Sequence, residues 1–229
     1  METDRRVPLA LLSETRKGAI VTVEGEGGEY RGRVIRIDGE EAEVHVFEEL
    51  PFASESPLDI FLIQAVPKRE RMELIIQKAT ELGVKAIFPC MSERSITEGA
   101  PRGQDKSHRW QVVARRAVEQ CRRRLVPPVA PCRDFADALR GPAASDGLKL
   151  ILYEKERTTR LKDLLERPPG QRPERVVIAC GPEGGFTDDE VRTAVKNGFI
   201  PVSLGGRVLR CETAVLAALS IVQHEWGDL

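Results

Sequence analysis

The chain has 229 residues, of which 41% are hydrophobic and 31% charged. This apolar content can form a core, and it excludes a chain that is disordered over its whole length. Lysine and arginine total 35 against 36 acidic residues, so the net charge of −1 identifies no partner, and attraction for an anion requires a local patch. The length suits one substantial domain with a smaller one, since a domain averages about 150 residues.

Apolar runs and cysteines indicate the compartment. The longest apolar stretch, residues 214–222, is far shorter than the ~20 residues that cross a bilayer, and the charged N-terminus makes a poor signal peptide. The five cysteines are odd in number and include no Cys-x-x-Cys pair, and the three histidines are scattered. We therefore expect a cytoplasmic protein with no membrane segment, no disulfide framework and no metal.

Residues 18–50 have the pattern of short antiparallel strands, in which apolar and polar residues alternate. A glycine-rich turn at 25–28 and the pair Asp38-Gly39 separate these segments, and both are typical of hairpins. The pattern predicts a small barrel or sheet domain over residues 1–57.

Residues 58–229 alternate between apolar strands and amphipathic helices. Strands are expected at 58–66, 84–88, 148–153, 176–180 and 199–204, and helices at 72–82, 107–124, 187–198 and 212–226. Continuous apolar runs are typical of strands covered on both faces, so we predict an α/β domain with a mainly parallel sheet. Thr187 and Glu190 match a helix capping box, and Gly83 suits the residue after a helix.

Two glycine-rich loops follow buried strands, Gly-Pro-Glu-Gly-Gly-Phe at 181–186 and Leu-Gly-Gly at 204–206. Glycine lets the backbone approach a ligand, and the carboxyl ends of parallel strands meet at one edge, so both loops can line one pocket. Neither loop has the spacing of a dinucleotide or triphosphate motif. A tight strand-to-helix connection explains the first loop equally well.

Arg210 lies between the second glycine loop and the last helix. An arginine there either binds an anion or pairs with Glu212. For Glu212 and Thr213, capping of the helix N-terminus is the simpler explanation.

A basic segment spans residues 102–124, where eight cations stand against two acids, and a smaller basic group lies at 68–71. Guanidinium groups pair well with phosphate, which favours contact with an RNA backbone, and a solvated helix face is the alternative. We expect phosphate contacts from Lys68, Arg71, Arg109, Arg115, Arg116 and Arg123.

Six segments together resemble a known family. They are RMELIIQKATELG (71–83), SERS (92–95), RW (109–110), EQ (119–120), GPEGGF (181–186) and LRCETA (209–214). Over about residues 60–229 the chain resembles the ribosomal RNA small subunit methyltransferase E family. The resemblance implies a SPOUT α/β fold with a deep C-terminal trefoil knot over 58–229, a PUA-like β-barrel over 1–57, and a homodimer.

The resemblance also implies the activity and the site. The family methylates N3 of a uridine in 16S ribosomal RNA of the small subunit, with S-adenosylmethionine as methyl donor and no metal. Carried over residue by residue, the cofactor contacts are Leu152, Tyr153, Glu154, Gly181, Glu183, Gly184, Leu204, Gly205, Leu209 and Thr213. We expect Arg210 to hold the uracil and Glu212 either to orient Arg210 or to accept the N3 proton.

Three departures from the family pattern stand out. The N-terminal domain looks shortened, Cys121-Arg122-Arg123 stands where Ser-Gly-Arg is usual, and Cys211 replaces a threonine. We expect Arg122 to stiffen a helix, because glycine costs about 1 kcal/mol there, and Cys211 to lose a hydroxyl hydrogen bond.

Two alternatives remain open at this point. One is a SPOUT enzyme that acts on another RNA or at a ribose 2′-oxygen. The other is a non-catalytic RNA-binding relative.

Overall fold

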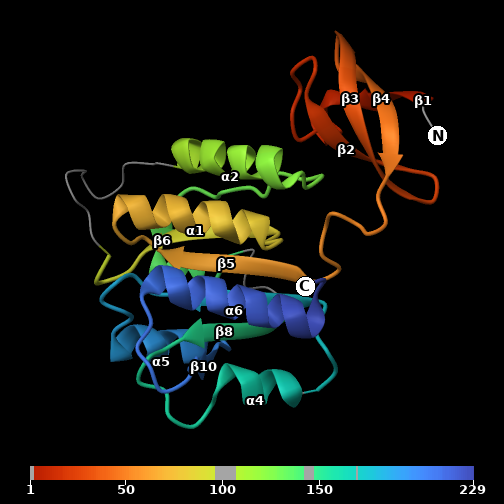
Figure 1. Cartoon of the computed structure of the whole chain (residues 1–229). Coiled ribbons are helices and arrows are strands. Elements are labelled where there is room, and N and C mark those ends of the chain that lie inside the picture. Colours follow the sequence, from red (N-terminus) through yellow and green to blue (C-terminus); the bar gives the residue numbers. More distant parts are fainter. Residues whose placement is uncertain (1–2, 96–106, 142–146, 169) are drawn as a thin grey trace.

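The computed structural model describes residues 3–95, 107–141, 147–168 and 170–229, and it places an antiparallel sheet beside a larger α/β unit (Figure 1). Residues 102–106 of the basic segment therefore lie outside the described residues. Residues 50–58 join the two units without a helix or a strand.

Four antiparallel strands form the N-terminal sheet. They are β1 (Thr3–Pro8), β2 (Ile20–Gly25), β3 (Gly28–Asp38) and β4 (Glu41–Glu49), in the order β1-β4-β3-β2, and the 3-10 turn η1 (Leu9–Leu11) follows β1. Val21, Val34 and Val44 are buried in its small core. Both predicted hairpins are confirmed. The sequence analysis missed β1, because four of its six residues are charged or proline and none is fully buried.

Six parallel strands form the larger sheet, as predicted. They are β5 (Asp59–Ala65), β6 (Ala86–Met91), β7 (Arg133–Asp134), β8 (Leu148–Leu152), β9 (Arg175–Cys180) and β10 (Ile200–Val202), in the order β10-β8-β9-β5-β6-β7. Because β8, β9 and β10 are neighbours and parallel, their carboxyl ends lie side by side at one edge.

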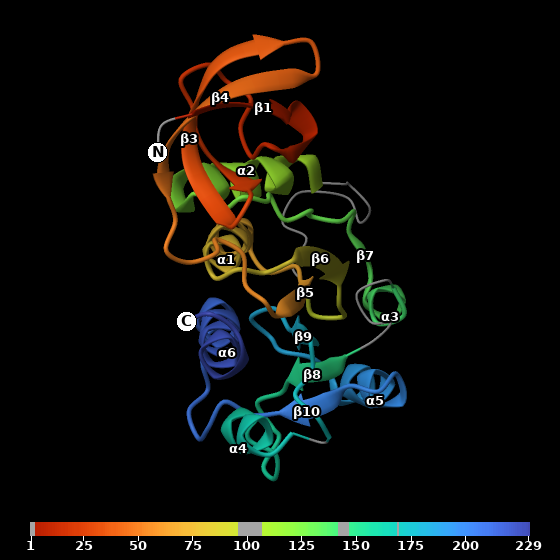
Figure 2. The ribbon, with the colours of Figure 1, turned by 90° about the vertical axis from the view of Figure 1, so that its right-hand side faces the viewer.

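Helices cover both faces of this sheet (Figure 2). On one face lie α1 (Arg69–Glu81), α4 (Leu161–Glu166) and α6 (Cys211–Trp226), with α2 (Ser107–Cys121) packed on α1; on the other lie α3 (Phe135–Ala138) and α5 (Asp188–Lys196). The predicted capping box of α5 is present, and Gly83 follows α1 with a φ of +82°. The sequence analysis missed α3, α4 and β7, which are too short to show a period.

Helix α2 ends at Cys121, three residues earlier than predicted. Arg122 has a φ of +64°, in the left-handed region that favours glycine. The expectation that Arg122 stiffens a helix is therefore wrong: it is the residue after the helix, where its side chain is a cost.

Arg123 and Arg124 join the two units of the chain. The Arg123 side chain is only 6% exposed; it pairs with Glu55 at 2.6 Å and donates to the carbonyls of Thr80 and Val84. Arg124 pairs at 2.9 Å with Glu29, which lies in strand β3 of the N-terminal sheet. We call Arg123, Arg124, Glu55 and Glu29 the interdomain clamp. A buried guanidinium needs such partners, so the clamp has a structural role.

We expect Arg123→Met to lower the free energy of unfolding by about 3–5 kcal/mol, because it leaves the largely buried Glu55 carboxylate without its cation. Urea unfolding measures the change. Arg140→Met is the matched control, since Arg140 pairs with Asp137 in solvent and should change stability by at most about 0.5 kcal/mol. Equal effects of the two substitutions would contradict the clamp.

We expect Arg122→Gly to raise the free energy of unfolding by about 1 kcal/mol, because glycine adopts the left-handed conformation without a steric penalty. The same replacement at Arg116, in the interior of α2, should lower it by about 1 kcal/mol. If urea unfolding shows a gain of stability for Arg122→Gly and a loss for Arg116→Gly, the helix ends at Cys121. A loss of stability in both variants would contradict this helix end.

Candidate functional site

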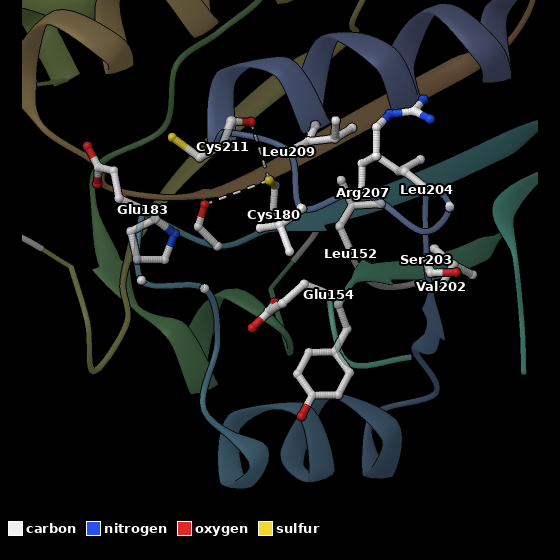
Figure 3. A pocket seen from close by; sticks show the side chains of 18 of the residues that line it. Leu152, Glu154, Cys180, Glu183, Val202, Ser203, Leu204, Arg207, Leu209 and Cys211 are labelled. Atoms are coloured by element: carbon white, nitrogen blue, oxygen red, sulfur yellow. Dashed lines mark hydrogen bonds between the residues drawn. The ribbon is translucent and has the colours of Figure 1, made fainter. Parts of the chain in front are cut away.

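A pocket opens at the sheet edge where β8, β9 and β10 end (Figure 3). It encloses about 890 Å³ of space between protein atoms, with the solvent at its open mouth included. Its walls are the loop after β8 (153–160), the first glycine loop (181–186), the second glycine loop with its continuation (203–209), and the first turn of α6. The two glycine loops that the sequence indicated therefore do line one pocket.

The first glycine loop folds tightly against the loop after β8. Gly185 has a φ of +66°, and a Cβ atom on it would lie 2.9 Å from a carboxylate oxygen of Glu154. Its N–H donates to the carbonyl of Pro182, which closes the turn. The glycine is needed here for its conformation, because a residue with a side chain is strained at this φ, whereas the exposed Glu154 carboxylate is the end of a flexible side chain and can move.

The loop after β8 encloses the end of β10. The Tyr153 N–H donates to the Val202 carbonyl, the Ser203 N–H donates to the Thr159 carbonyl, and the Leu161 N–H donates to the Ser203 carbonyl. Glu156 organises this loop by accepting from the Thr158 hydroxyl and from the N–H groups of Thr158 and Thr159, which lowers its pKa to about 2.

The first turn of α6 presents Cys211 and Ala214 to the pocket. The Cys211 thiol donates to Glu212 Oε2 at 3.2 Å, so the position carries a thiol hydrogen bond. Burial, followed by the neighbouring Glu212 carboxylate, raises the pKa of Cys211 to about 12. The thiol stays protonated at neutral pH and keeps donating.

Three charged side chains meet beside the pocket. Arg71 Nη1 lies 3.1 Å from Glu183 Oε1, and Arg71 Nε lies 3.8 Å from Glu212 Oε2. The Glu183 side chain turns away from the cavity toward the first turn of α1, where the Lys68 N–H also donates to Oε1 (Figure 3). We name Arg71, Glu183 and Glu212 the arginine bridge.

Nine of the ten residues predicted to contact a cofactor line the pocket. They are Leu152, Tyr153, Glu154, Gly181, Glu183, Gly184, Leu204, Gly205 and Leu209. Thr213, the tenth, does not line it, since the helical period points Cys211 and Ala214 inward and leaves Thr213 exposed. The sequence reasoning missed Cys180, Val202 and Ala214, although each belongs to an apolar run that ends or begins at a named loop.

Arg210 and Glu212 flank Cys211 in the chain, and neither of them lines the pocket itself. Arg210 is the N-cap residue of α6, has no side-chain capping hydrogen bond and is exposed. Glu212 is half-buried. Partial burial alone would raise the pKa of Glu212, but hydrogen bonds from its own N–H and from Cys211, with the charges of Arg71 and Arg210, lower it on balance.

The predicted phosphate contacts separate into two groups. Lys68, Arg109, Arg115 and Arg116 are exposed on α1 and α2, and Arg109 also pairs with Glu73 at 2.6 Å. The expectation for Arg123 is wrong, because the interdomain clamp buries it. Arg71 belongs to the arginine bridge rather than to the exposed group.

Other classes of site find little support in the described residues. None of the helices there is long and apolar enough to cross a membrane. Nor do those residues contain a group of three or more His, Cys, Asp or Glu side chains suited to a metal ion. The five cysteines are free thiols.

Comparison with known proteins defines the class. Residues 54–223 match the family model of the RNA methyltransferase domain. The Synechocystis ribosomal RNA small subunit methyltransferase E is 34% identical over 200 residues, which are 87% of this chain and 64% of that protein. The chain thus spans somewhat less than two thirds of that relative.

Solved structures agree with this class. The crystal structure of a ribosomal RNA small subunit methyltransferase E from Neisseria gonorrhoeae, bound to S-adenosylmethionine, is 36% identical, with a TM-score of 0.73 over 100% of this chain and 94% of that one. A putative methyltransferase from Legionella pneumophila in complex with the same cofactor is 34% identical, with a TM-score of 0.71 over 99% of this chain and 94% of that one. The chain belongs to the ribosomal RNA small subunit methyltransferase E family, as its motifs predict.

We expect Gly185→Ala to lower the free energy of unfolding by about 1–2 kcal/mol, because alanine is strained at a φ of +66°. Gly206→Ala is the control: its φ is not positive, and a Cβ atom there meets nothing within 4 Å. Thermal or urea unfolding of both variants tests the expectation. Equal effects of the two alanines would contradict the strain at Gly185.

Proposed function

We propose that the protein methylates N3 of a uridine in 16S ribosomal RNA of the small subunit, with S-adenosylmethionine as methyl donor. The observation that carries the proposal is the pocket formed by the three loops after β8, β9 and β10. Its lining combines two glycine loops with apolar side chains, and two relatives of about one-third identity bind S-adenosylmethionine.

The residues of the pocket suit this cofactor. Leu152, Val202 and Leu209 offer apolar surface for an adenine ring, and the backbone of Gly205 and Gly206 is open, since Cβ atoms there would meet nothing within 4 Å. The Glu154 carboxylate is exposed and available to hydroxyl groups. S-adenosylmethionine supplies a methyl group activated by a positive sulfur, so the reaction needs no metal.

The protein has two tasks at the acceptor base. N3 of uridine carries a proton and lies on the Watson–Crick edge, so the base has to be unpaired or flipped out. We assign Arg210 to hold the uracil and the negative charge that develops on it, since it is exposed and lies between Leu209 and Cys211, which line the pocket. We assign Glu212 to accept the N3 proton, because its lowered pKa keeps it ionised at neutral pH.

The exposed cations of α1 and α2 are the proposed RNA contacts. Lys68, Arg109, Arg115 and Arg116 would act through phosphates, which position the RNA without reading its sequence. A loss of any one of them should weaken binding and make it less dependent on salt.

We also propose the architecture that the family implies. Val202 and Ser203 form hydrogen bonds with both ends of the loop after β8, at Tyr153 and at Leu161. The chain at the end of β10 therefore lies within this loop before it continues to α6, and this arrangement supports the proposed C-terminal trefoil knot. The four-stranded sheet supports a PUA-like N-terminal domain over residues 1–57, followed by the methyltransferase domain over 58–229. We further propose that the protein is a homodimer and that it acts in the cytoplasm.

The test is methyl transfer from labelled S-adenosylmethionine to undermethylated small ribosomal subunits and to naked 16S RNA, with identification of the labelled nucleoside. We expect 3-methyluridine. Label at a ribose 2′-oxygen or in another RNA would contradict the specificity. An absence of both label and cofactor binding would leave an RNA-binding protein.

We expect Arg210→Ala and Glu212→Gln each to reduce the rate of methyl transfer by about 10²-fold or more, while RNA affinity changes little, because both act at the base. Single-turnover rates at saturating RNA measure this. Arg116→Ala is the matched control: it should weaken RNA binding and leave the saturated rate unchanged. Near-normal rates for Arg210→Ala in a folded protein would contradict its role.

A further inference from the structure

Arg71 was predicted from the sequence to contact an RNA phosphate, and the structure gives it a different position. We propose that Arg71 is a positioning residue of the methyl-transfer site, which ties the first glycine loop to the start of α6 by pairing with Glu183 and Glu212 at the same time. The proposal deepens the proposed function and rests on it.

The geometry joins three elements that are far apart in the chain. Arg71 lies in the first turn of α1, Glu183 in the first glycine loop, and Glu212 in the first turn of α6. The guanidinium reaches Glu183 through Nη1 at 3.1 Å and Glu212 through Nε at 3.8 Å. The two carboxylates belong to two different elements beside the pocket, so the Arg71 side chain links these elements, next to the Cys180 thiol, which donates to the Cys211 carbonyl.

Both carboxylates of the arginine bridge are shielded from solvent, which makes their pairing with Arg71 important for stability. The Glu183 side chain is 19% exposed and that of Glu212 is 17% exposed. Glu183 Oε2 is buried and has no hydrogen-bond partner among the described residues, so Oε1, with Arg71 and the Lys68 N–H, holds the whole group. Two shielded carboxylates repel each other unless a cation lies between them.

An arginine suits this position better than a lysine. Its planar guanidinium carries donors in several directions and can serve two carboxylates, whereas an ammonium on a flexible stem usually serves one well. Glu212 faces three charged or titratable groups: Arg71 from α1, and Cys211 and Arg210 beside it. Loss of Arg71 removes one of the two cations near Glu212 and the cation that pairs with Glu183.

The experiment compares Arg71→Met with Arg69→Met. Arg69 lies two residues earlier on α1, is 67% exposed and pairs only with Glu73 among the described contacts, so its variant removes the same charge from the same helix. S-adenosylmethionine affinity is measured by calorimetry and RNA affinity by filter binding. We expect Arg71→Met to weaken cofactor binding roughly tenfold or more and Arg69→Met to change it less than twofold, with similar losses of RNA affinity in both.

The pH dependence of single-turnover methyl transfer gives a second readout. If Glu212 accepts a proton, the rate rises with pH as Glu212 ionises. Loss of a neighbouring cation raises the pKa of Glu212, so the acid limb should move to higher pH in Arg71→Met and stay in place in Arg71→Lys and Arg69→Met. A merely structural role would not move this limb.

Several outcomes would overturn the proposal. It fails if Arg71→Met weakens RNA binding alone, with cofactor affinity and acid limb unchanged, since that is the behaviour of a phosphate contact. Arg71→Lys is the second variant, and it replaces Arg71→Met in the test if that protein does not fold. The proposal also fails if Arg71→Lys keeps full cofactor affinity.

Failure of the proposed function has a different signature. In that case the wild-type protein itself neither binds S-adenosylmethionine nor transfers a methyl group. Hydrogen exchange still tests the bridge: we expect the amides of residues 183–186 to exchange faster in Arg71→Met than in Arg69→Met. Equal exchange in both would overturn the bridge whatever the activity.

Discussion

The site depends on three neighbouring parallel strands that end at one edge of the sheet. Strands β8, β9 and β10 follow one another in the chain but lie in the order β10-β8-β9, so their loops meet only when the sheet is assembled. The Val202–Ser203 segment is then held by hydrogen bonds on both sides by the loop after β8. Everything that makes the pocket, including the two glycine loops and the first turn of α6, is positioned by this arrangement.

Burial decides which arginines can serve RNA. The segment from Arg109 to Arg124 reads as one basic run, yet α2 exposes only part of it. Arg115 and Arg116 lie in solvent, whereas Arg123 is buried in the interdomain clamp with Glu55, and Arg71 on α1 sits between two shielded carboxylates. A buried cation requires an anion, so these two arginines hold parts of the protein together.

The departures from the family pattern have local consequences that only geometry shows. Arg122 takes the left-handed conformation, which favours glycine, so the chain carries a small steric cost at the end of α2. The Cys211 thiol donates to the Glu212 carboxylate, so this position has a hydrogen bond at the start of α6.

The sequence by itself determined the α/β class, the parallel sheet, both hairpins, the capping box and the family, because these depend on local periodicity, turn chemistry and motifs. It also located both glycine loops and nine of the pocket residues. It could not determine the end of α2, the outward position of Thr213, or the partners of Arg71 and Arg123. Charge and spacing do not tell which side chain becomes buried, and a buried guanidinium pairs with carboxylates from distant elements that only the tertiary structure brings near it.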